Sequence, residues 1–326
     1  MKLINNNENQ EGTTMLLELK NLVKRYQDHL AVDHVTLSVK EGEIMGLLGP
    51  NGAGKTTTLN MITGLSKIDG GSIRVFGKEI QDKAQSIKKD IGVVPQEIAI
   101  FEDLTAAENA AFFGKLYGLR GSLLKERVQE ALAFTGLESH GEQYPKKFSG
   151  GMKRRLNIAC AIVHKPGLVI MDEPTVGIDP QSRNHILESV KTLQKEGATI
   201  LYTSHYMEEV DNICSRIAIM DQGRIIAQGT SDELKTMISS EEKIEMTLSE
   251  ISYTLVDEIK KLDGVMECHL EGQVLTLLAR KNSGLMGHIS LIIGRSGSEI
   301  LSLQVDKVTL ESVFLTLTGK SLRDKA

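Results

Sequence analysis

A glycine-rich segment near the amino terminus has residue types and spacing that suit phosphate binding. It fits the pattern G-x-x-x-x-G-K-[ST] and reads Gly49-Pro50-Asn51-Gly52-Ala53-Gly54-Lys55-Thr56. Glycines let the backbone turn tightly, so that several N–H groups point inward at phosphate oxygens. A helix expected from Lys55 onward adds the positive end of its dipole. We expect Lys55 to reach the β- and γ-phosphates of a nucleotide and the Thr56 hydroxyl to bind Mg²⁺.

Two carboxylates end a continuous apolar run, Leu168-Val169-Ile170-Met171-Asp172-Glu173. Such a run is typical of a strand buried on both faces. The strand would deliver Asp172 to the edge of the sheet beside the glycine-rich segment, where it can hold Mg²⁺ directly or through water. Glu173 would point elsewhere and can polarise an attacking water. Alone, this pattern is more often only a strand end, but a phosphate-binding segment upstream favours the functional interpretation.

A third segment, Phe148-Ser149-Gly150-Gly151-Met152, places a hydroxyl and two glycines at the expected start of a helix. Free backbone N–H groups at a helix start make this another anion site. One chain gains nothing obvious from two phosphate sites. A head-to-tail pair of chains gains from having both sites, because the Ser149 loop of each chain can close on the nucleotide of the other.

With these segments the chain resembles the ATP-binding cassette (ABC) family, closely and over nearly its whole length. The segments look like the Walker A loop, the Walker B strand and the signature motif, whose first position is often Leu and is here Phe148. Gln96 matches the Q-loop glutamine, and His205 matches the switch histidine. Gly177-Ile178-Asp179-Pro180 matches the D-loop. Tyr26 lies about where the family places an aromatic residue that stacks on adenine, although it can instead be a core aromatic.

The resemblance implies a set of site residues. ATP would be bound by Tyr26, Gly49, Pro50, Asn51, Gly52, Ala53, Gly54, Lys55, Thr56 and Thr57. The nucleotide of the opposite chain would be contacted by Ser149, Gly150, Gly151 and Asp179. Catalysis would fall to Glu173, His205, Lys55 and Gln96, and Mg²⁺ binding to Thr56, Gln96 and Asp172. His29 and His34 match no motif, and we interpret them as structural.

The elements that must position these residues alternate between strands and helices, which predicts a parallel sheet covered on both faces. We expect an α/β fold: a P-loop NTPase (RecA-like) core with an antiparallel β subdomain and a helical subdomain at about 97–160. The pattern changes after Leu234, where a predicted hairpin indicates a small C-terminal α+β accessory domain. The expected divisions are a flexible tail (1–14), the ATPase domain (15–234) and the accessory domain (235–326).

The composition and charge of the chain disfavour several classes of protein. The chain has 326 residues and a formal net charge of −5, so no basic stripe predicts a nucleic-acid partner. We interpret its most basic cluster, which is Lys146, Lys147, Lys153, Arg154 and Arg155, as a solvated helix start. Three separated cysteines indicate buried thiols in a reducing compartment. No apolar window is long enough for a spanning helix, and the Asn-rich start does not resemble a signal peptide.

These features predict an ATP-hydrolysing subunit that pairs on ATP binding, as a homodimer or with another ABC subunit. The end of the chain, Thr309–Gly319, resembles subunits of ABC-2-type exporters, which implies a separate integral membrane permease and a cytoplasmic location at the inner face of the membrane. One alternative is a soluble ABC ATPase acting in translation or DNA maintenance. A GTP-binding switch is disfavoured because no Asn-Lys pair occurs, and a non-hydrolysing ATP binder because Lys55, Asp172, Glu173 and His205 are intact.

Overall fold

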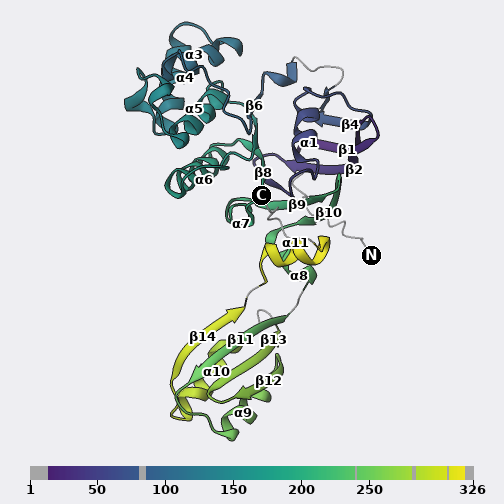
Figure 1. Ribbon diagram of the computed structural model, residues 1–326, viewed down its shortest axis with the longest axis vertical. Helices are drawn as coiled ribbons and strands as arrows, with labels where there is room; N and C mark the ends of the chain where they lie inside the picture. Colours follow the sequence, from purple (N-terminus) through teal and green to yellow (C-terminus); the bar gives the residue numbers. More distant parts are fainter. Residues whose placement is uncertain (1–13, 81–85, 239–240, 281–283, 307, 320–326) are drawn as a thin grey trace, which may run out of the picture. The chain divides into compact units, whose positions relative to one another are not determined.

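The computed structural model describes residues 14–80, 86–238, 241–280, 284–306 and 308–319 (Figure 1). The expected tail at 1–14 lies outside the described residues except for Thr14. Contacts within the chain divide it into two compact units, with the main boundary between Ser231 and Asp232.

The apolar runs of the sequence form a sheet in the first unit with the strand order β10-β9-β3-β8-β7-β6. Neighbouring strands from β9 to β6 are parallel, and β10 is an antiparallel edge strand. Every residue of β3, β7 and β8 is buried, as parallel strands between two helical layers require. The strands are β3 (Ile44–Leu48), β6 (Ile91–Val94), β7 (Leu168–Asp172), β8 (Thr199–Ser204), β9 (Arg216–Asp221) and β10 (Arg224–Gly229).

Three helices follow strands of this sheet and begin at its carboxyl edge. They are α1 (Lys55–Ile62), α6 (Pro180–Lys195) and α7 (Met207–Ile213). Asp179 caps α6 by accepting a hydrogen bond from the Ser182 N–H at 2.9 Å, and Pro180 occupies the first helical position, where its missing N–H costs nothing. The helix starts therefore face the same edge as the expected site.

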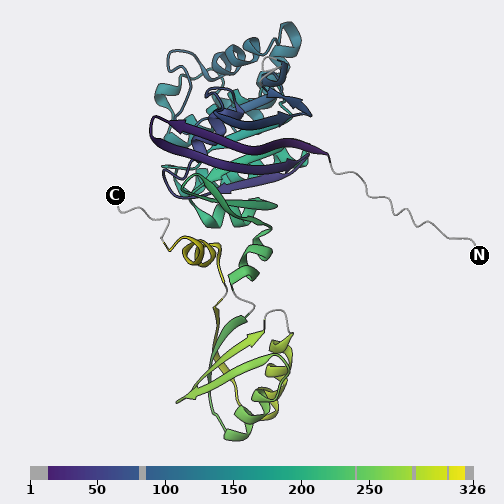
Figure 2. The same cartoon turned by 90° about the vertical axis from the view of Figure 1, so that its right-hand side faces the viewer.

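An antiparallel sheet with the order β2-β1-β4-β5 forms the expected β subdomain. Its strands are β1 (Met15–Tyr26), β2 (His29–Lys40), β4 (Gly70–Val75) and β5 (Lys78–Glu79). The long strands β1 and β2 run side by side across the first unit (Figure 2). Leu17 and Leu37 share a hydrophobic core with Leu47 and Ile170 of the central sheet. This shared core fixes the β1–β2 turn, and with it Tyr26, relative to the glycine-rich segment.

The helical subdomain gathers beside the central sheet (Figure 1) and contains α3 (Ala106–Leu116), α4 (Gly121–Phe134) and α5 (Gly150–Ile162). Thr105 caps α3, and Glu108 completes a reciprocal capping box. Two short 3-10 turns, Glu138–His140 and Pro145–Lys147, precede α5. Of the three cysteines expected to be buried, Cys160 and Cys268 are buried, whereas Cys214 is only partly buried.

The interpretation of the basic cluster as a solvated helix start is wrong for Arg154. Its side chain is 3% exposed, and its guanidinium donates hydrogen bonds to the carbonyl oxygens of Pro95, at 2.7 Å, and of Gln96. Lys153 pairs with Glu102 at 2.5 Å. These contacts hold the segment around Gln96 against the helix that Ser149 begins.

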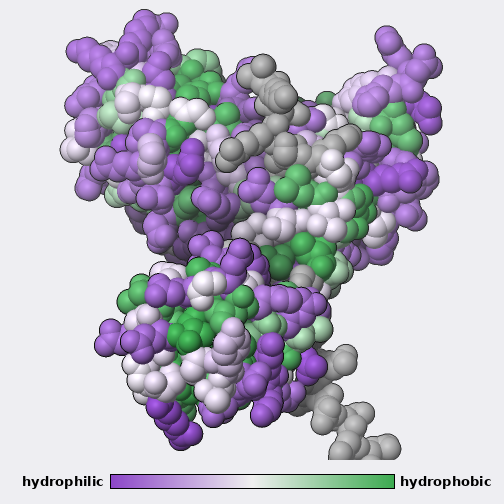
Figure 3. Space-filling view, turned by 60° about the horizontal axis from the view of Figure 1, so that its bottom comes forward, coloured by the Kyte–Doolittle hydropathy of each residue, from purple (hydrophilic) through white to green (hydrophobic). Residues whose placement is uncertain are grey.

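The second unit has the α+β architecture that we expected. Its elements are α8 (Ser231–Ile238), β11 (Glu241–Leu248), α9 (Tyr253–Lys260), β12 (Val265–Glu271), β13 (Val274–Arg280), α10 (Leu285–Arg295), β14 (Ile300–Asp306) and α11 (Leu310–Thr318). The sheet order is β12-β13-β11-β14, all antiparallel, which is the split β-α-β arrangement. Ile244, Leu277, Ile259 and Ile289 pack its sheet against α9 and α10. Figure 3 shows hydrophobic patches between hydrophilic ones on the surface in view.

Within the described residues, no helix combines the length and the apolar character needed to cross a bilayer.

A stacked pair of rings joins the end of α3 to the end of α5. The Tyr117 and His164 ring centroids are 3.5 Å apart and the planes differ by 2°. Nε2 of His164 lies 3.3 Å from the carbonyl oxygen of Ile91, at the start of β6. Burial lowers the pKa of His164 from 6.5 to about 4.

This histidine should make stability depend on pH. Between about pH 6.5 and 4 the unfolded chain binds a proton at His164 that the folded chain does not, so the free energy of unfolding should fall as pH falls through this range. His164→Phe keeps a ring for Tyr117 and removes the titration. In urea titrations at about pH 7.5 and about pH 5, the variant should lose less stability than the wild type. Equal losses would contradict this assignment.

Candidate functional site

A cavity of about 440 Å³ lies at the carboxyl edge of the parallel sheet. Ligands of α/β folds bind at this edge. Its lining combines the glycine-rich segment with residues from the β subdomain and the strand ends: Tyr26, His29, Ala31, Asn51, Gly52, Ala53, Gly54, Lys55, Thr56, Thr57, Gln96 and Glu173. Most of these residues were expected from the motifs, but His29 and Ala31 were not. His29 was interpreted as structural, and its position three residues after Tyr26, at the start of β2, is the sequence signal that connects it with the site.

The glycine-rich segment has the close backbone packing that its composition predicts. Gly54 has φ +103°, a region that side chains strongly disfavour, and a Cβ there would lie 2.5 Å from the carbonyl oxygen of Ala31. Helix α1 starts at the next residue. Its unpaired N–H groups therefore face the cavity, which suits a phosphate group.

Lys55 is 5% exposed and is held by three contacts. Its Nζ donates to the carbonyl oxygens of Gly49 at 2.8 Å and of Pro50 at 3.2 Å, and lies 3.1 Å from Oε1 of Glu173. Because these contacts already fix the Lys55 ammonium group, it loses little conformational freedom when it binds an anion. Gly49 and Pro50 thus support the lysine from behind the cavity lining.

Oxygen ligands suited to Mg²⁺ meet beside the lysine. The Thr56 hydroxyl donates to Oδ2 of Asp172 at 2.9 Å, and the Thr203 hydroxyl donates to Oδ1 at 2.7 Å. Hard cations such as Mg²⁺ prefer carboxylate and hydroxyl oxygens and retain water and phosphate ligands. The Thr56 and Asp172 oxygens, with Gln96 on the cavity lining, fit that preference.

Glu173 stands between Lys55 and His205. Its Oε2 lies 3.1 Å from Nδ1 of His205, and its backbone adopts φ +46°, which is unusual for a residue with a side chain. Burial alone would raise the pKa of Glu173, but the hydrogen bond with His205 and the charge of Lys55 outweigh burial and hold the pKa below its ordinary value. The carboxylate is therefore ionised at neutral pH, as a base or a water-orienting group must be.

Tyr26 lines the cavity and is 47% exposed. Nζ of Lys24 lies 5.2 Å from the ring centroid, so the ring already carries a cation–π contact. An exposed ring beside a phosphate-binding loop is available for stacking on a base.

The Ser149 segment does not line this cavity. Ser149 caps α5 by accepting a hydrogen bond from the Met152 N–H at 3.2 Å, and both Ser149 and Gly150 are exposed. Gly151 is buried, and a Cβ on it would lie 3.3 Å from Oδ2 of Asp179. The signature segment and the Asp179 turn are therefore neighbours, away from the nucleotide cavity of their own chain.

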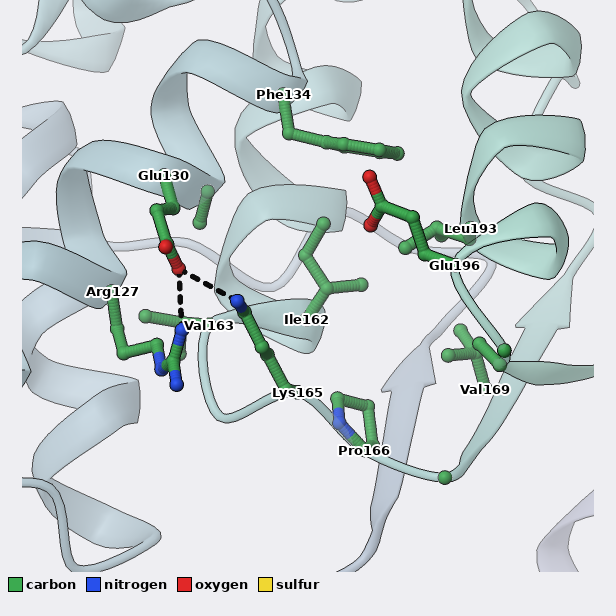
Figure 4. A pocket seen from close by; sticks show the side chains of 14 residues that line it. Arg127, Glu130, Phe134, Ile162, Val163, Lys165, Pro166, Val169, Leu193 and Glu196 are labelled. Carbon is green, nitrogen blue, oxygen red and sulfur yellow. Dashed lines mark hydrogen bonds and ion pairs between the residues drawn. The ribbon is translucent and has the colours of Figure 1, made fainter.

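A larger cavity of about 730 Å³ lies at the amino ends of β7 and β8, the edge opposite to the phosphate-binding loop. Glu130 pairs there with Arg127 at 2.6 Å and with Lys165 at 3.0 Å, and Figure 4 shows both cations directed at this carboxylate. Three of the four charged side chains that line this cavity, all except that of Glu196, thus pair with one another, and the cavity lies away from Lys55 and Glu173. We assign the chemistry to the smaller cavity.

The fold and the cavity define an ATPase with a P-loop, in which a helix start, a buried lysine and an Asp-Glu pair meet at one edge of a parallel sheet. Residues 32–176 match the family described as ABC transporter. The linearmycin resistance ATP-binding protein LnrL of Bacillus subtilis is 46% identical over 323 residues, which cover 95% of this chain and 100% of that protein. The Nod factor export ATP-binding protein I of Cupriavidus metallidurans is 39% identical over 311 residues, covering 95% and 100%.

A solved dimeric ATP-binding cassette in a post-hydrolysis state, bound to ADP and Pi, is 28% identical with a TM-score of 0.61, covering 66% of this chain and 98% of that one. The chain belongs to the family of ABC transporter ATP-binding proteins, as its motifs predicted. It is an ATP-binding and ATP-hydrolysing subunit of the exporter type.

Proposed function

We propose that two copies of this chain, or one copy and a related subunit, enclose two ATP·Mg²⁺ at their interface and drive an ABC-2-type export permease. One observation carries this proposal. The groups that handle phosphate meet at one cavity, whereas Ser149 and Gly150 lie exposed and outside it. A second chain in head-to-tail orientation would place its Ser149, Gly150, Gly151 and Asp179 against the nucleotide.

In the proposed reaction, the backbone N–H groups of the glycine-rich loop and Lys55 bind the phosphates, and Tyr26 stacks on adenine. Glu173 accepts a hydrogen bond from the attacking water and orients it toward the γ-phosphate. His205 holds Glu173 and steadies the charge that develops on the γ-phosphate. Mg²⁺, bound by Thr56, Asp172 and Gln96, would neutralise phosphate charge. Hydrolysis then removes the γ-phosphate that both chains contact, and the two chains separate.

An exposed apolar patch next to Gln96 supports a membrane partner. The patch consists of Ile98, Phe101, Phe112 and Leu116, with exposed fractions of 37%, 46%, 39% and 66%. The rings of Phe101 and Phe112 pack edge to face with centroids 4.9 Å apart. Exposed apolar side chains near one another suit an interaction site, and Ile98 follows Gln96 by two residues, so a partner bound here would respond to movements of Gln96. The permease would dock here, and the chain would then lie at the inner face of the membrane.

The patch can be tested by Phe112→Ser, with Leu123→Ser as the matched control because Leu123 is 44% exposed on α4 and outside the patch. When each full-length variant is expressed with the permease, Phe112→Ser should reduce co-purification by about tenfold or more, and Leu123→Ser should not. Both should hydrolyse ATP alike without the permease. Equal co-purification would contradict the docking surface, and co-purification with ribosomal RNA would favour action in translation.

We also propose that residues 15–234 form the ATPase domain and 235–326 the accessory domain. The contact boundary after Ser231 and the separate core around Ile244 and Leu277 support this division.

A further inference from the structure

Glu209, on α7, belongs to none of the motifs that define the site, yet it is a buried carboxylate that is only 4% exposed. Its Oε2 accepts hydrogen bonds from three hydroxyl groups. These are the hydroxyls of Thr175 at 2.7 Å, Tyr202 at 2.9 Å and Ser204 at 3.2 Å. Burial and the neighbouring carboxylate raise the pKa of Tyr202 well above 10, so the phenol keeps its proton and remains a donor.

The other carboxylate oxygen faces a cation. Oε1 of Glu209 lies 3.4 Å from Nε of Arg183, on α6. The Arg183 guanidinium lies 4.7 Å from the centroid of the Tyr206 ring, which in turn lies 4.3 Å from the centroid of the His205 ring. The backbone N–H of Tyr206 also donates to the Ser204 hydroxyl at 2.9 Å. Both flanks of His205 are therefore connected to Glu209.

The partners of Glu209 come from the segments that carry the reactive groups. Thr175 follows Glu173 by two residues, Ser204 directly precedes His205, and Arg183 lies in the helix that Asp179 caps. Burying a carboxylate is costly unless its partners compensate, and an apolar side chain would fill the same space without that cost. Packing alone therefore does not explain why a charged residue lies where three segments of the site meet.

We propose that Glu209 is a positioning residue, which fixes the Glu173 segment, the His205 segment and the start of α6 relative to one another so that Glu173 and His205 meet in the geometry needed for hydrolysis. This inference rests on the proposed roles of Glu173 and His205. Glu209 itself does not touch the reacting atoms. Its loss should lower kcat and leave the affinity for ATP almost unchanged, because the glycine-rich loop and Lys55 are not among its partners.

The test is Glu209→Gln in the full-length chain, which keeps the shape and removes the charge. The matched control is Glu43→Gln, because Glu43 is a 7% exposed carboxylate that contacts Arg216 at 3.2 Å at the amino end of β3, away from the cavity. Both variants lose a buried charge and should lose similar stability. Steady-state phosphate release with Mg·ATP should show kcat lowered about tenfold in Glu209→Gln with KM changed less than about twofold, and both unchanged in Glu43→Gln.

A second readout separates positioning from general loosening. Glu209 is proposed to act through the contact between Glu173 and His205, whose Oε2 and Nδ1 atoms are 3.1 Å apart, so its effect on kcat should depend on Glu173. Glu209→Gln should therefore lower kcat about tenfold in the otherwise wild-type chain but less than about twofold in a chain that already carries Glu173→Gln. If Glu209→Gln does not fold, Thr175→Val and Ser204→Ala each remove one donor, and each should lower kcat without raising KM.

The outcomes are distinguishable. The positioning role alone would be overturned if the wild type is active and Glu209→Gln, or both single-donor variants, match Glu43→Gln in kcat. It would also be overturned if Glu209→Gln lowers kcat as much in the Glu173→Gln chain as in the otherwise wild-type chain. A wild type that leaves Mg·ATP intact, or a Glu173→Gln variant as active as the wild type, would overturn the proposed roles of the site and this inference with them.

Discussion

Glu173→Gln should lower kcat by roughly 10²- to 10⁴-fold, the usual contribution of a general base, while ATP-dependent dimers accumulate. Glutamine has the same shape but is a poor base, and it loses the ion pair with Lys55 at 3.1 Å. ATP binding and closure of the pair use other residues, so closure should proceed and reopening should fail. Phosphate release measures the first effect, and size-exclusion chromatography with ATP measures the second.

Glu196→Gln is a suitable control for this substitution. Glu196 is an exposed glutamate that lines the larger cavity, at the amino edge of the sheet. Its substitution should leave kcat and the oligomeric state unchanged, which also checks that the larger cavity is not the catalytic one. Unaltered hydrolysis in Glu173→Gln would count against Glu173 as the base.

The sequence predicts most of the central architecture because strong local patterns and tertiary burial agree there. The apolar run at Leu168–Met171 is a strand, and a helix begins at Lys55, as expected. Local residue types also locate the phosphate-binding loop, since its glycines and Lys55 act through their own backbone and neighbours. Thr56 and Asp172, 116 positions apart, could be paired in advance only because the loop before Thr56 and the strand that ends at Asp172 reach the same edge of one parallel sheet.

Residues whose partners lie far away in the sequence could not be predicted in this way. Arg154 bonds to a carbonyl 59 positions away, so charge patterning wrongly favoured a solvated position. Glu209 bonds to Thr175, 34 positions away, and no local pattern distinguishes it from the exposed carboxylates of α7. His29 faces the cavity because the β1–β2 hairpin packs on the central core, which is also a tertiary effect.

The adjacent glycines of the signature segment should respond to substitution in opposite ways. An added Cβ at Gly151 would lie 2.1 Å from the Ser182 hydroxyl, whereas one at Gly150 would meet nothing within 4 Å. Gly151→Ala must therefore push α5 and α6 apart, and should destabilise the fold by about 1–3 kcal/mol. Gly150→Ala sits in an exposed first helical turn, and should keep or raise stability by up to about 1 kcal/mol.

Turnover should not follow stability in this pair. If Gly150 approaches the nucleotide of the opposite chain, the methyl group added by Gly150→Ala would hold the two chains apart. A displacement of about 1 Å costs roughly 100-fold in rate. Thermal unfolding and phosphate release would then show a Gly150→Ala variant that is stable but nearly inactive and does not dimerise with ATP. Ser182→Gly should restore stability to Gly151→Ala by removing the clash.

The control for Gly150→Ala is Gly287→Ala, because Gly287 lies in α10 of the second unit and also has open space around its Cβ position. It should leave turnover unchanged, so any loss in Gly150→Ala belongs to the position and not to the change of residue type. A stable Gly150→Ala variant with full turnover would mean that this exposed helix start meets no nucleotide. The head-to-tail pairing depends on that contact, since within one chain Ser149 and Gly150 lie outside the ATP cavity.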